Sequence, residues 1–261
     1  MRRNIQKIHF RASKSEKAQE AYNEFMKIYE NSSYEESDAI VILGGDGFML
    51  HNLSLLHGKP LYGINCGSVG FLMNDYCTKN ILERLSDAIE YTFHPLKMIV
   101  FDDTDSICAE FFVVNEVSIL RKLVSDQVVQ AAKLKVTINS QVRLPELVCD
   151  GLIVATPLGS TAYNFSALGP ILPFGSPHLV LTPVSPFKPR RWSGAVLSND
   201  VIIEIQVLEH QQRPVIATAD RLAIEPVSRL RITHSPDTTM RILSDPNRPW
   251  SDRILAAQFP I

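Results

Sequence analysis

The stretch from Ala39 to Gly47 reads AIVILGGDG, and it decides the fold class of the first third of the chain. Its apolar part, Ala39–Leu43, is a continuous run that suits a strand buried on both faces of a parallel sheet. Gly44 and Gly45 stop that run, and the residues that follow can form a helix. A strand that leads through a glycine turn into a helix is the beginning of a βαβ unit.

The flanking sequence repeats the same alternation of strands and helices. Residues 7–11 and 61–65 are short runs typical of strands. One helix is predicted after a capping box at Ser13–Glu16, with apolar residues at helical spacing up to Tyr29, and another over residues 80–92. This rhythm predicts an α/β domain with a parallel sheet over residues 1–93.

The pattern changes after Pro95, where one strand-like run follows another and few segments have helical spacing. Strands are predicted at 111–114, 133–138, 152–155, 201–207 and 230–233. Asn139-Ser140 fits a hairpin turn, and the prolines between 170 and 189 exclude a long helix there. We therefore predict a β-rich second domain over residues 94–245. The weakly helical tail, 246–261, can pack back on the first domain.

The composition is that of a globular protein without a strong overall charge. The chain has 261 residues, 45% of them hydrophobic, and a formal net charge of −2. No global positive field attracts nucleic acid, and no apolar run is long enough to span a bilayer. The N-terminus lacks the apolar region of a signal peptide, and the four cysteines lack the spacing of a zinc site or a disulfide framework. We expect a cytoplasmic protein with reduced thiols and with neither nucleic acid nor a membrane as partner.

The first candidate for chemistry is the loop Gly44-Gly45-Asp46-Gly47. Ligands of open α/β sheets bind beyond the carboxyl ends of the strands, where this loop is expected. Gly45 and Gly47 let backbone N–H groups approach phosphate oxygens, and Asp46 can act as a base or hold Mg²⁺. His51, further along the helix, can contact a phosphate. The alternative is a plain strand-to-helix turn with Asp46 as a helix cap and His51 exposed.

A second candidate is the pair Asn115-Glu116, which follows a predicted strand. A carboxylate accepts a hydrogen bond from a ribose hydroxyl, and an amide matches the N6/N7 edge of adenine. The pair is therefore able to hold a nucleoside. The end of a hairpin would explain the same two residues.

The third candidate is the longest, residues 149–171, which read CDGLIVATPLGSTAYNFSALGPI. The carboxylate of Asp150 precedes an apolar strand, and a turn of small and hydroxyl residues follows. Small residues let a planar ring approach, hydroxyls offer donors to phosphate or ribose, and Tyr163 can line or stack on that ring. A β-turn and a short helix capped by Ser160 or Thr161 would explain the turn, but not Asp150 and the small residues together.

GGDG at 44–47, Asn115-Glu116 and the segment 150–171 together resemble the NAD kinase family, in order and in separation. The GGDG box is shared with diacylglycerol-kinase-like lipid kinases and, in variant form, with 6-phosphofructokinases, whereas the third segment is far more specific. The resemblance implies an α/β domain followed by a β-rich domain, an active site between them, and a homo-oligomer, often a dimer or tetramer. It also implies ATP-dependent phosphorylation of the adenosine-ribose 2′-hydroxyl of NAD to give NADP, with a divalent cation, Mg²⁺.

The resemblance also implies roles for particular residues. Asp46 resembles the catalytic base, and Gly45 and Gly47 resemble the glycines that shape its phosphate loop. Asn115 and Glu116 resemble the adenosine-binding pair, and Phe71, in the run GSVGFL, resembles a residue that lines the same pocket. The segment that binds the dinucleotide is matched by Asp150, Thr161, Ala162, Tyr163 and Ser166.

Some positions depart from the family pattern. Phe48 stands where a Thr is common, Leu158 where a Ser or Thr is usual, and Val148 where some relatives have a basic residue. Thr218-Ala-Asp220-Arg resembles the family's Asp-Gly turn without its glycine. Two other functions use part of the same pattern: a lipid or sphingoid kinase, which would need an apolar acceptor groove, and a non-catalytic regulator that binds NAD or ADP-ribose.

Overall fold

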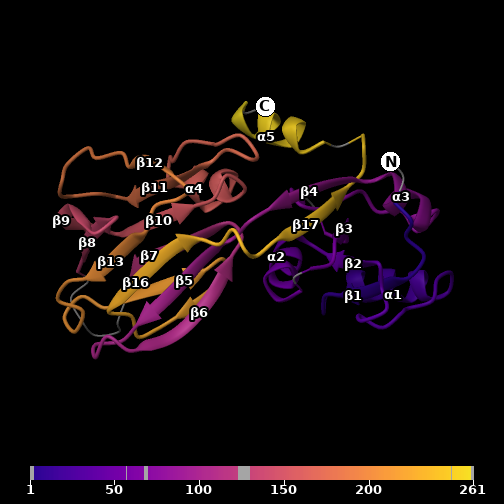
Figure 1. Ribbon diagram of the computed structural model, residues 1–261, viewed down its shortest axis with the longest axis horizontal. Helices are drawn as coiled ribbons and strands as arrows, with labels where there is room; N and C mark the ends of the chain where they lie inside the picture. Colours follow the sequence, from indigo (N-terminus) through magenta and orange to yellow (C-terminus); the bar gives the residue numbers. More distant parts are fainter. Residues whose placement is uncertain (1–2, 57, 68–69, 123–129, 248, 260–261) are drawn as a thin grey trace. The chain divides into compact units, whose positions relative to one another are not determined.

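The computed structural model describes residues 3–56, 58–67, 70–122, 130–247 and 249–259, so Ser68 and Val69 of the GSVGFL run and parts of the 246–261 tail lie outside it. The chain divides into two compact units (Figure 1). The first unit comprises Met1–Phe93 and Thr238–Ile261, and the second comprises His94–Asp237. Within the described residues, no helix is long and apolar enough to cross a membrane.

The first unit is built on a five-stranded, mostly parallel sheet. Strands β1 (Ile8–Ala12), β2 (Ala39–Gly44), β3 (Leu61–Asn65) and β17 (Met240–Ser244) run parallel in that order, and β4 (Ile89–Phe93) pairs antiparallel with β17. All six residues of β2 are buried, as its apolar run predicted. The helices of this unit are α1 (Glu16–Met26), α2 (Asp46–Leu55), α3 (Ile81–Asp87) and α5 (Trp250–Gln258).

Three details of the first unit differ from the sequence prediction. Helix α3 ends at Asp87, not at 92, because residues 89–93 pair with β17 as a strand. The range 94–245 for the second domain is too long, since β17 completes the sheet of the first unit. The predicted capping box at Ser13 is wrong, because α1 begins at Glu16 and its N-cap, Ser15, makes no side-chain capping bond.

The second unit contains two six-stranded antiparallel sheets in its described part. The order of one is β12 (Ala195–Ser198), β11 (His178–Val184), β10 (Gly151–Ala155), β7 (Glu116–Arg121), β14 (Val215–Ala219) and β15 (Leu222–Ile224). The order of the other is β6 (Ile107–Val113), β5 (Leu96–Phe101), β16 (Arg229–His234), β13 (Ile203–Val207), β8 (Ala132–Ile138) and β9 (Gln141–Cys149).

One hydrophobic core joins these two sheets. It includes Ile119 and Leu152 from the first and Leu134 and Ile205 from the second. The hairpin turn predicted at Asn139-Ser140 is confirmed between β8 and β9, and both residues have the positive φ that such two-residue turns require. The predicted fold class, an α/β domain with a parallel sheet followed by a β-rich domain, is confirmed.

Candidate active site

The GGDG loop joins β2 to α2. Gly44 is the last residue of β2, and Gly45 precedes the first helical residue with an extended backbone (φ −124°). A Cβ at Gly44 would lie 3.2 Å from the side chain of Phe48, which packs over the end of the strand. A Cβ at Gly45 would meet nothing within 4 Å. This open space leaves room for a phosphate near the N-terminus of α2, where backbone amides favour anions.

Asp46 is the first residue of α2, and its carboxylate bonds to the loop that follows β3. Oδ2 accepts a hydrogen bond from the Phe71 amide (2.7 Å), and Oδ1 accepts one from the Leu72 amide (2.9 Å). These two bonds fix the direction of the Asp46 side chain. Each carboxylate oxygen has a second lone pair, so Asp46 remains able to accept a proton or another hydrogen bond.

Helix α5 also contacts this loop, through a hydrogen bond from Arg253 to a backbone carbonyl group. Arg253 donates to the Phe71 carbonyl (2.5 Å) and to the Ser244 hydroxyl (2.9 Å). The ring of Phe71 meets the buried ring of Trp250 nearly edge-on, with the two centroids 6.2 Å apart. Phe71 therefore links the C-terminal helix to Asp46, and its place in a nucleotide pocket stays a prediction.

His51 lies on α2 in an exposed position. It follows Asp46 by five residues, which at 3.6 residues per turn places it roughly 140° around the helix from Asp46. The structure thus does not bring His51 to the carboxylate of Asp46, and its contact with a phosphate stays a prediction.

Two residues from other strands or turns hold the backbone of residues 114–116. The Asp220 carboxylate, between β14 and β15, accepts hydrogen bonds from the amides of Val114 (2.9 Å), Asn115 (2.7 Å) and Glu116 (3.3 Å). Thr156 donates its hydroxyl to the Val114 carbonyl (2.7 Å) and its amide to the Asn115 carbonyl (2.9 Å). The Asp220 amide donates to the Glu116 carbonyl at 3.1 Å. Every backbone polar group of the three residues is therefore satisfied within the fold.

The Glu116 side chain lies in a buried and negatively charged setting. It is 8% exposed, and its Oε2 atom is buried without a hydrogen-bond partner among the described residues. Burial, followed by the charge of Asp220, raises the pKa of Glu116 to about 8. Burial also raises the pKa of Asp220, although its three amide donors act in the opposite direction. Because an unpaired buried polar atom is costly, Oε2 is suited to a hydrogen bond with a ligand.

The segment after β10 packs directly on Asn115. Gly159 begins a short 3₁₀ turn, Gly159–Thr161, and a Cβ on it would lie 2.1 Å from the Asn115 carbonyl oxygen, so only glycine fits. Buried Asn164, in helix α4 (Tyr163–Ser166), donates to the Ser160 carbonyl (3.0 Å) and accepts from the Thr182 hydroxyl (2.7 Å). The predicted binding residues of this segment are half-buried (Thr161, Ala162 and Tyr163) or exposed (Ser166).

Asp150 lies at the far end of β10 from Glu116. In the antiparallel pair of β10 and β7, Ala155 faces Glu116, and Asp150 precedes the first residue of β10. Five residues of strand, roughly 17 Å, therefore separate Asp150 from the residues around Asn115. Its carboxylate forms an ion pair with Arg121 at 2.7 Å. Within one chain, the structure brings Asn115, Glu116 and the turn at 159–163 together, but not Asp150.

The hydroxyl of Tyr163 is affected by two carboxylates, one near each end of β10. It packs against a small cluster of buried residues that includes Ile153 and Ala155 of that strand. Burial raises the pKa of the Tyr163 hydroxyl, and the charges of Glu116 and Asp150 raise it further. A ligand that contacts Tyr163 is thus within the electrostatic influence of both carboxylates.

Two family models and several curated relatives match the chain. Residues 1–92 match the ATP-NAD kinase N-terminal domain, and residues 114–243 match the ATP-NAD kinase C-terminal domain. The NAD kinase of Rhizobium meliloti is 51% identical over 99% of both chains. The chain belongs to the NAD kinase family. The NAD kinase of Brucella melitensis is 46% identical, over 97% of this chain and 96% of its own length. As a member of the NAD kinase family, the chain is a kinase.

Solved structures of the NAD kinase family share the fold. A yeast NADH kinase solved in complex with NADH has a TM-score of 0.81 at 18% identity, and covers 96% of this chain and 86% of its own. An NAD kinase from Archaeoglobus fulgidus, solved in complex with ATP, has a TM-score of 0.71 at 23% identity over 96% of both chains. At these identities the likeness supports the two-domain fold.

The departures from the NAD kinase pattern have structural explanations in two cases. Leu158 is 4% exposed, so this side chain packs in the interior and does not line a surface turn. Phe48 covers Gly44. Val148 bonds through its backbone, donating to the Lys188 carbonyl at 2.8 Å, and nothing in these contacts explains its side chain.

Sequence reasoning missed the residues that hold the NAD kinase motifs in place. Asp220 and Thr156 fix Asn115-Glu116, Asn164 fixes the turn after β10, and Arg253 fixes Phe71. For Asp220 a signal was present, since Thr218-Ala-Asp220-Arg resembles the family's Asp-Gly turn, but that resemblance did not indicate its bonds to residues 114–116.

Proposed function

We propose that this chain transfers the γ-phosphoryl group of ATP to the adenosine-ribose 2′-hydroxyl of NAD, giving NADP and ADP, with Asp46 as general base. The observation that carries this proposal is the fixed Asp46 carboxylate in the GGDG loop, bonded by the Phe71 and Leu72 amides at 2.7 and 2.9 Å. A carboxylate held in one direction beside an open glycine loop is suited to meet a hydroxyl and a phosphate together.

The proposed step balances without any further reactant. The 2′-hydroxyl oxygen forms a bond to the γ-phosphorus of ATP, the bond from that phosphorus to the β,γ-bridging oxygen breaks, and ADP leaves. The hydroxyl proton passes to a lone pair of Asp46 that the loop amides do not use. Gly45 leaves open space before α2 where the phosphates approach, and Gly47 adds no side chain in the first turn of α2.

The nucleoside of NAD is held, in this proposal, by the second unit. The unpartnered Oε2 of Glu116 forms a hydrogen bond with the nucleoside, and the Asn115 amide meets the adenine edge. Tyr163 stacks on or lines a ring, while Thr161, Ala162 and Ser166 offer small or hydroxyl groups around it. Asp150 is assigned to substrate binding as well, from its carboxylate and from the resemblance.

A divalent cation, Mg²⁺, fits this proposal with few protein ligands. In kinase sites Mg²⁺ is usually held by one or two carboxylates together with substrate phosphates. No group of three or more His, Cys, Asp or Glu side chains that could hold a metal occurs in the described part of the chain. The ATP phosphates and water would therefore supply its ligands, which leaves the Asp46 carboxylate available for the proton. The cation would neutralise charge on the transferred phosphoryl group.

A homo-oligomer, a dimer or tetramer, and a cytoplasmic location complete the proposal. Both rest on the resemblance to the family and on the sequence composition. Light scattering on the purified protein tests the oligomeric state, and a monomer at micromolar concentration would contradict it.

The proposed reaction is tested with NAD, ATP and Mg²⁺, and NADP is detected by an NADP-specific dehydrogenase. Parallel reactions replace NAD by diacylglycerol, or omit ATP. NADP formed only in the complete mixture supports the proposal. Phosphorylated diacylglycerol would point to a lipid kinase, and calorimetric binding of NAD without turnover would point to a non-catalytic regulator.

A further inference from the structure

The clearest unexplained arrangement in the second unit is the pair of carboxylates at residues 116 and 220. Asp220 is bonded by three backbone amides, which favour its ionised form against the burial that raises its pKa. Glu116, whose own amide is one of those three donors, has a buried Oε2 without a partner in the described residues. Both carboxylate oxygens of Asp220 thus accept hydrogen bonds, whereas Oε2 of Glu116 has no hydrogen-bond partner among the described residues.

We propose that Asp220 is a positioning residue for nucleotide binding: it fixes the backbone of Asn115-Glu116, and its charge acts on the Glu116 carboxyl in addition to burial. This role rests on the proposed function of the Asn115-Glu116 pair. Asp220 itself touches no reacting atom, and acts only through the pair that it holds.

The physical basis is that two neighbouring carboxylates do not both ionise readily at a buried site. Burial raises the pKa of both carboxyls, but three amide donors oppose that rise for Asp220, whereas for Glu116 the like charge of Asp220 adds to it. Glu116 is therefore the partner that carries the proton near neutral pH. A protonated carboxyl both donates and accepts, which lets it bond to a hydroxyl or to a ring nitrogen of a nucleoside.

The titratable groups that interact with Glu116, directly or through Tyr163, lie in three different elements. Asp220 lies in the turn after β14, Tyr163 in α4, and Asp150 just before β10. The charge of Asp220 raises the pKa of Glu116, and the charges of Glu116 and Asp150 raise the pKa of Tyr163. Of these, Asp220 is the charge that acts on Glu116 itself. Removing that charge should therefore move the titration of Glu116, and removing a distant charge should not.

Asp220→Asn is the informative variant. The asparagine oxygen can still accept from the amides of Asn115 and Glu116, while the Val114 amide loses its acceptor. If Asp220 only holds the backbone, the variant weakens NAD binding equally at every pH. If its charge also acts on Glu116, the pH at which Glu116 ionises falls by roughly one pH unit or more, the size expected from a neighbouring like charge.

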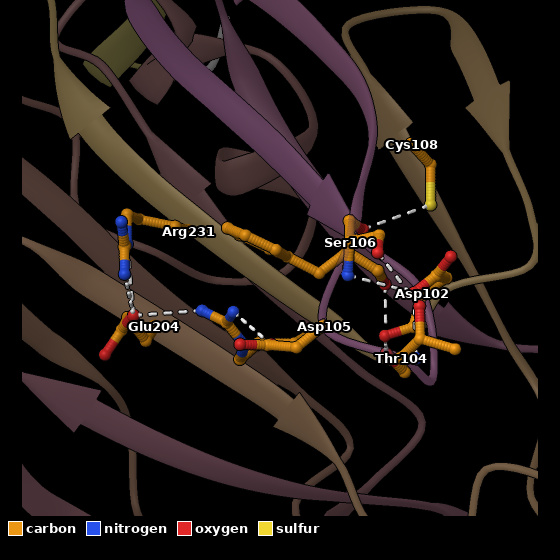
Figure 2. Close-up of polar contacts among 10 residues, drawn as sticks. Asp102, Thr104, Asp105, Ser106, Cys108, Glu204 and Arg231 are labelled. Carbon is orange, nitrogen blue, oxygen red and sulfur yellow. Dashed lines mark hydrogen bonds and ion pairs between the residues drawn. The ribbon is translucent and has the colours of Figure 1, made fainter.

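Asp105→Asn is the matched control, because it removes the same charge from the same unit. Asp105, labelled in Figure 2, lies in the loop between β5 and β6. Its exposed carboxylate pairs with Arg229. Its φ of 65° suits asparagine, and it is not among the charges that act on Glu116.

The test is a pH titration of the full chain, labelled with ¹³C at glutamate carboxyl carbons and observed by NMR without ligand. Glu116→Gln assigns the Glu116 signal by its disappearance. We expect Glu116 to titrate near pH 8 in the wild type and in Asp105→Asn, and at lower pH in Asp220→Asn. An ordinary glutamate titration in the wild type, or an unchanged one in folded Asp220→Asn, would overturn the proposal.

Calorimetric NAD binding between pH 6 and 9 completes the test. We expect the NAD dissociation constant of the wild type to change with pH around one midpoint. In Asp220→Asn this midpoint should move to lower pH, and in Glu116→Gln the pH dependence should disappear. If NAD does not bind to the wild type at all, the proposed function fails, while the ligand-free titration still decides the role of Asp220. If NAD binds with a midpoint that Asp220→Asn leaves unmoved, the inference fails and the proposed function stands.

Discussion

Replacing Gly159 by alanine tests whether the turn after β10 must touch Asn115. The new Cβ would lie 2.1 Å from the Asn115 carbonyl oxygen and 2.3 Å from its carbonyl carbon, where ordinary contacts begin near 3.4 Å. The two segments must therefore separate by more than about 1 Å, because both contacts are with backbone. That movement breaks the bonds from the Thr156 amide to Asn115 (2.9 Å) and from the Gly159 amide to the Thr156 hydroxyl (3.0 Å).

The expected loss follows from these contacts. Overpacking costs about 1–3 kcal/mol, and each lost hydrogen bond about 0.5–1.5 kcal/mol. We expect Gly159→Ala to lower the free energy of unfolding by about 2–6 kcal/mol. The folded fraction should bind NAD at least about tenfold more weakly, which corresponds to a loss of about 1.4 kcal/mol in binding free energy. Urea unfolding followed by circular dichroism measures the first, and calorimetry the second.

Gly45→Ala is the control for stability. A Cβ there meets nothing within 4 Å, and its φ of −124° is open to any residue, so the free energy of unfolding should change by less than about 1 kcal/mol. The same methyl group occupies space kept for phosphate, so ATP affinity should fall. Equal stability of Gly159→Ala and the wild type, with unchanged NAD affinity, would refute the packing argument.

Three further outcomes are expected. Asp150→Asn should raise KM for NAD with a smaller change in kcat, measured by steady-state kinetics, and a selective collapse of kcat would contradict a binding role. Leu158→Ser should lower the free energy of unfolding by about 2–5 kcal/mol, as removal of a buried leucine does. KM for NAD in the folded enzyme should change less than about tenfold. An unchanged urea midpoint would show that the Leu158 side chain is not packed. Thiol titration without reductant should find the exposed Cys77 and Cys108 reactive in the native protein. Cys149 should react only in denaturant, because burial raises its pKa to about 12. A disulfide would contradict this prediction.

Elements with local signals were predictable from the sequence. The apolar run before Gly44 became β2, and Asn139-Ser140 became the expected hairpin turn. Residues 89–92 were assigned to the end of a helix because their spacing is amphipathic, yet residues 89–93 form β4. The partner of β4 is β17, which the chain reaches only about 150 residues later, so no local pattern indicates the pairing.

Candidate site residues could be chosen from the sequence where residue type carries the chemistry. Asp46 and the pair Asn115-Glu116 were chosen from their side chains and their positions at strand ends, and their roles stay predictions. The turn that contains Asp220 was noted in the sequence, but its role was not predictable, because its bonds go to backbone amides more than 100 residues away, and amides have no sequence signature. The sequence shows that Leu158 stands where a Ser or Thr is usual, but not that it is buried, because sequence alone does not tell which side of a turn faces the core.

The central claim, that Asp46 is the base of an NAD kinase, is tested most directly by the kinetics of Asp46→Asn. The asparagine keeps an oxygen acceptor for one loop amide but cannot take the hydroxyl proton. With folding confirmed by circular dichroism, we predict a kcat lower by about 10²–10⁴ while the calorimetric affinity for NAD stays nearly normal. A folded Asp46→Asn enzyme that forms NADP from NAD and ATP with near-normal kcat would contradict the assignment.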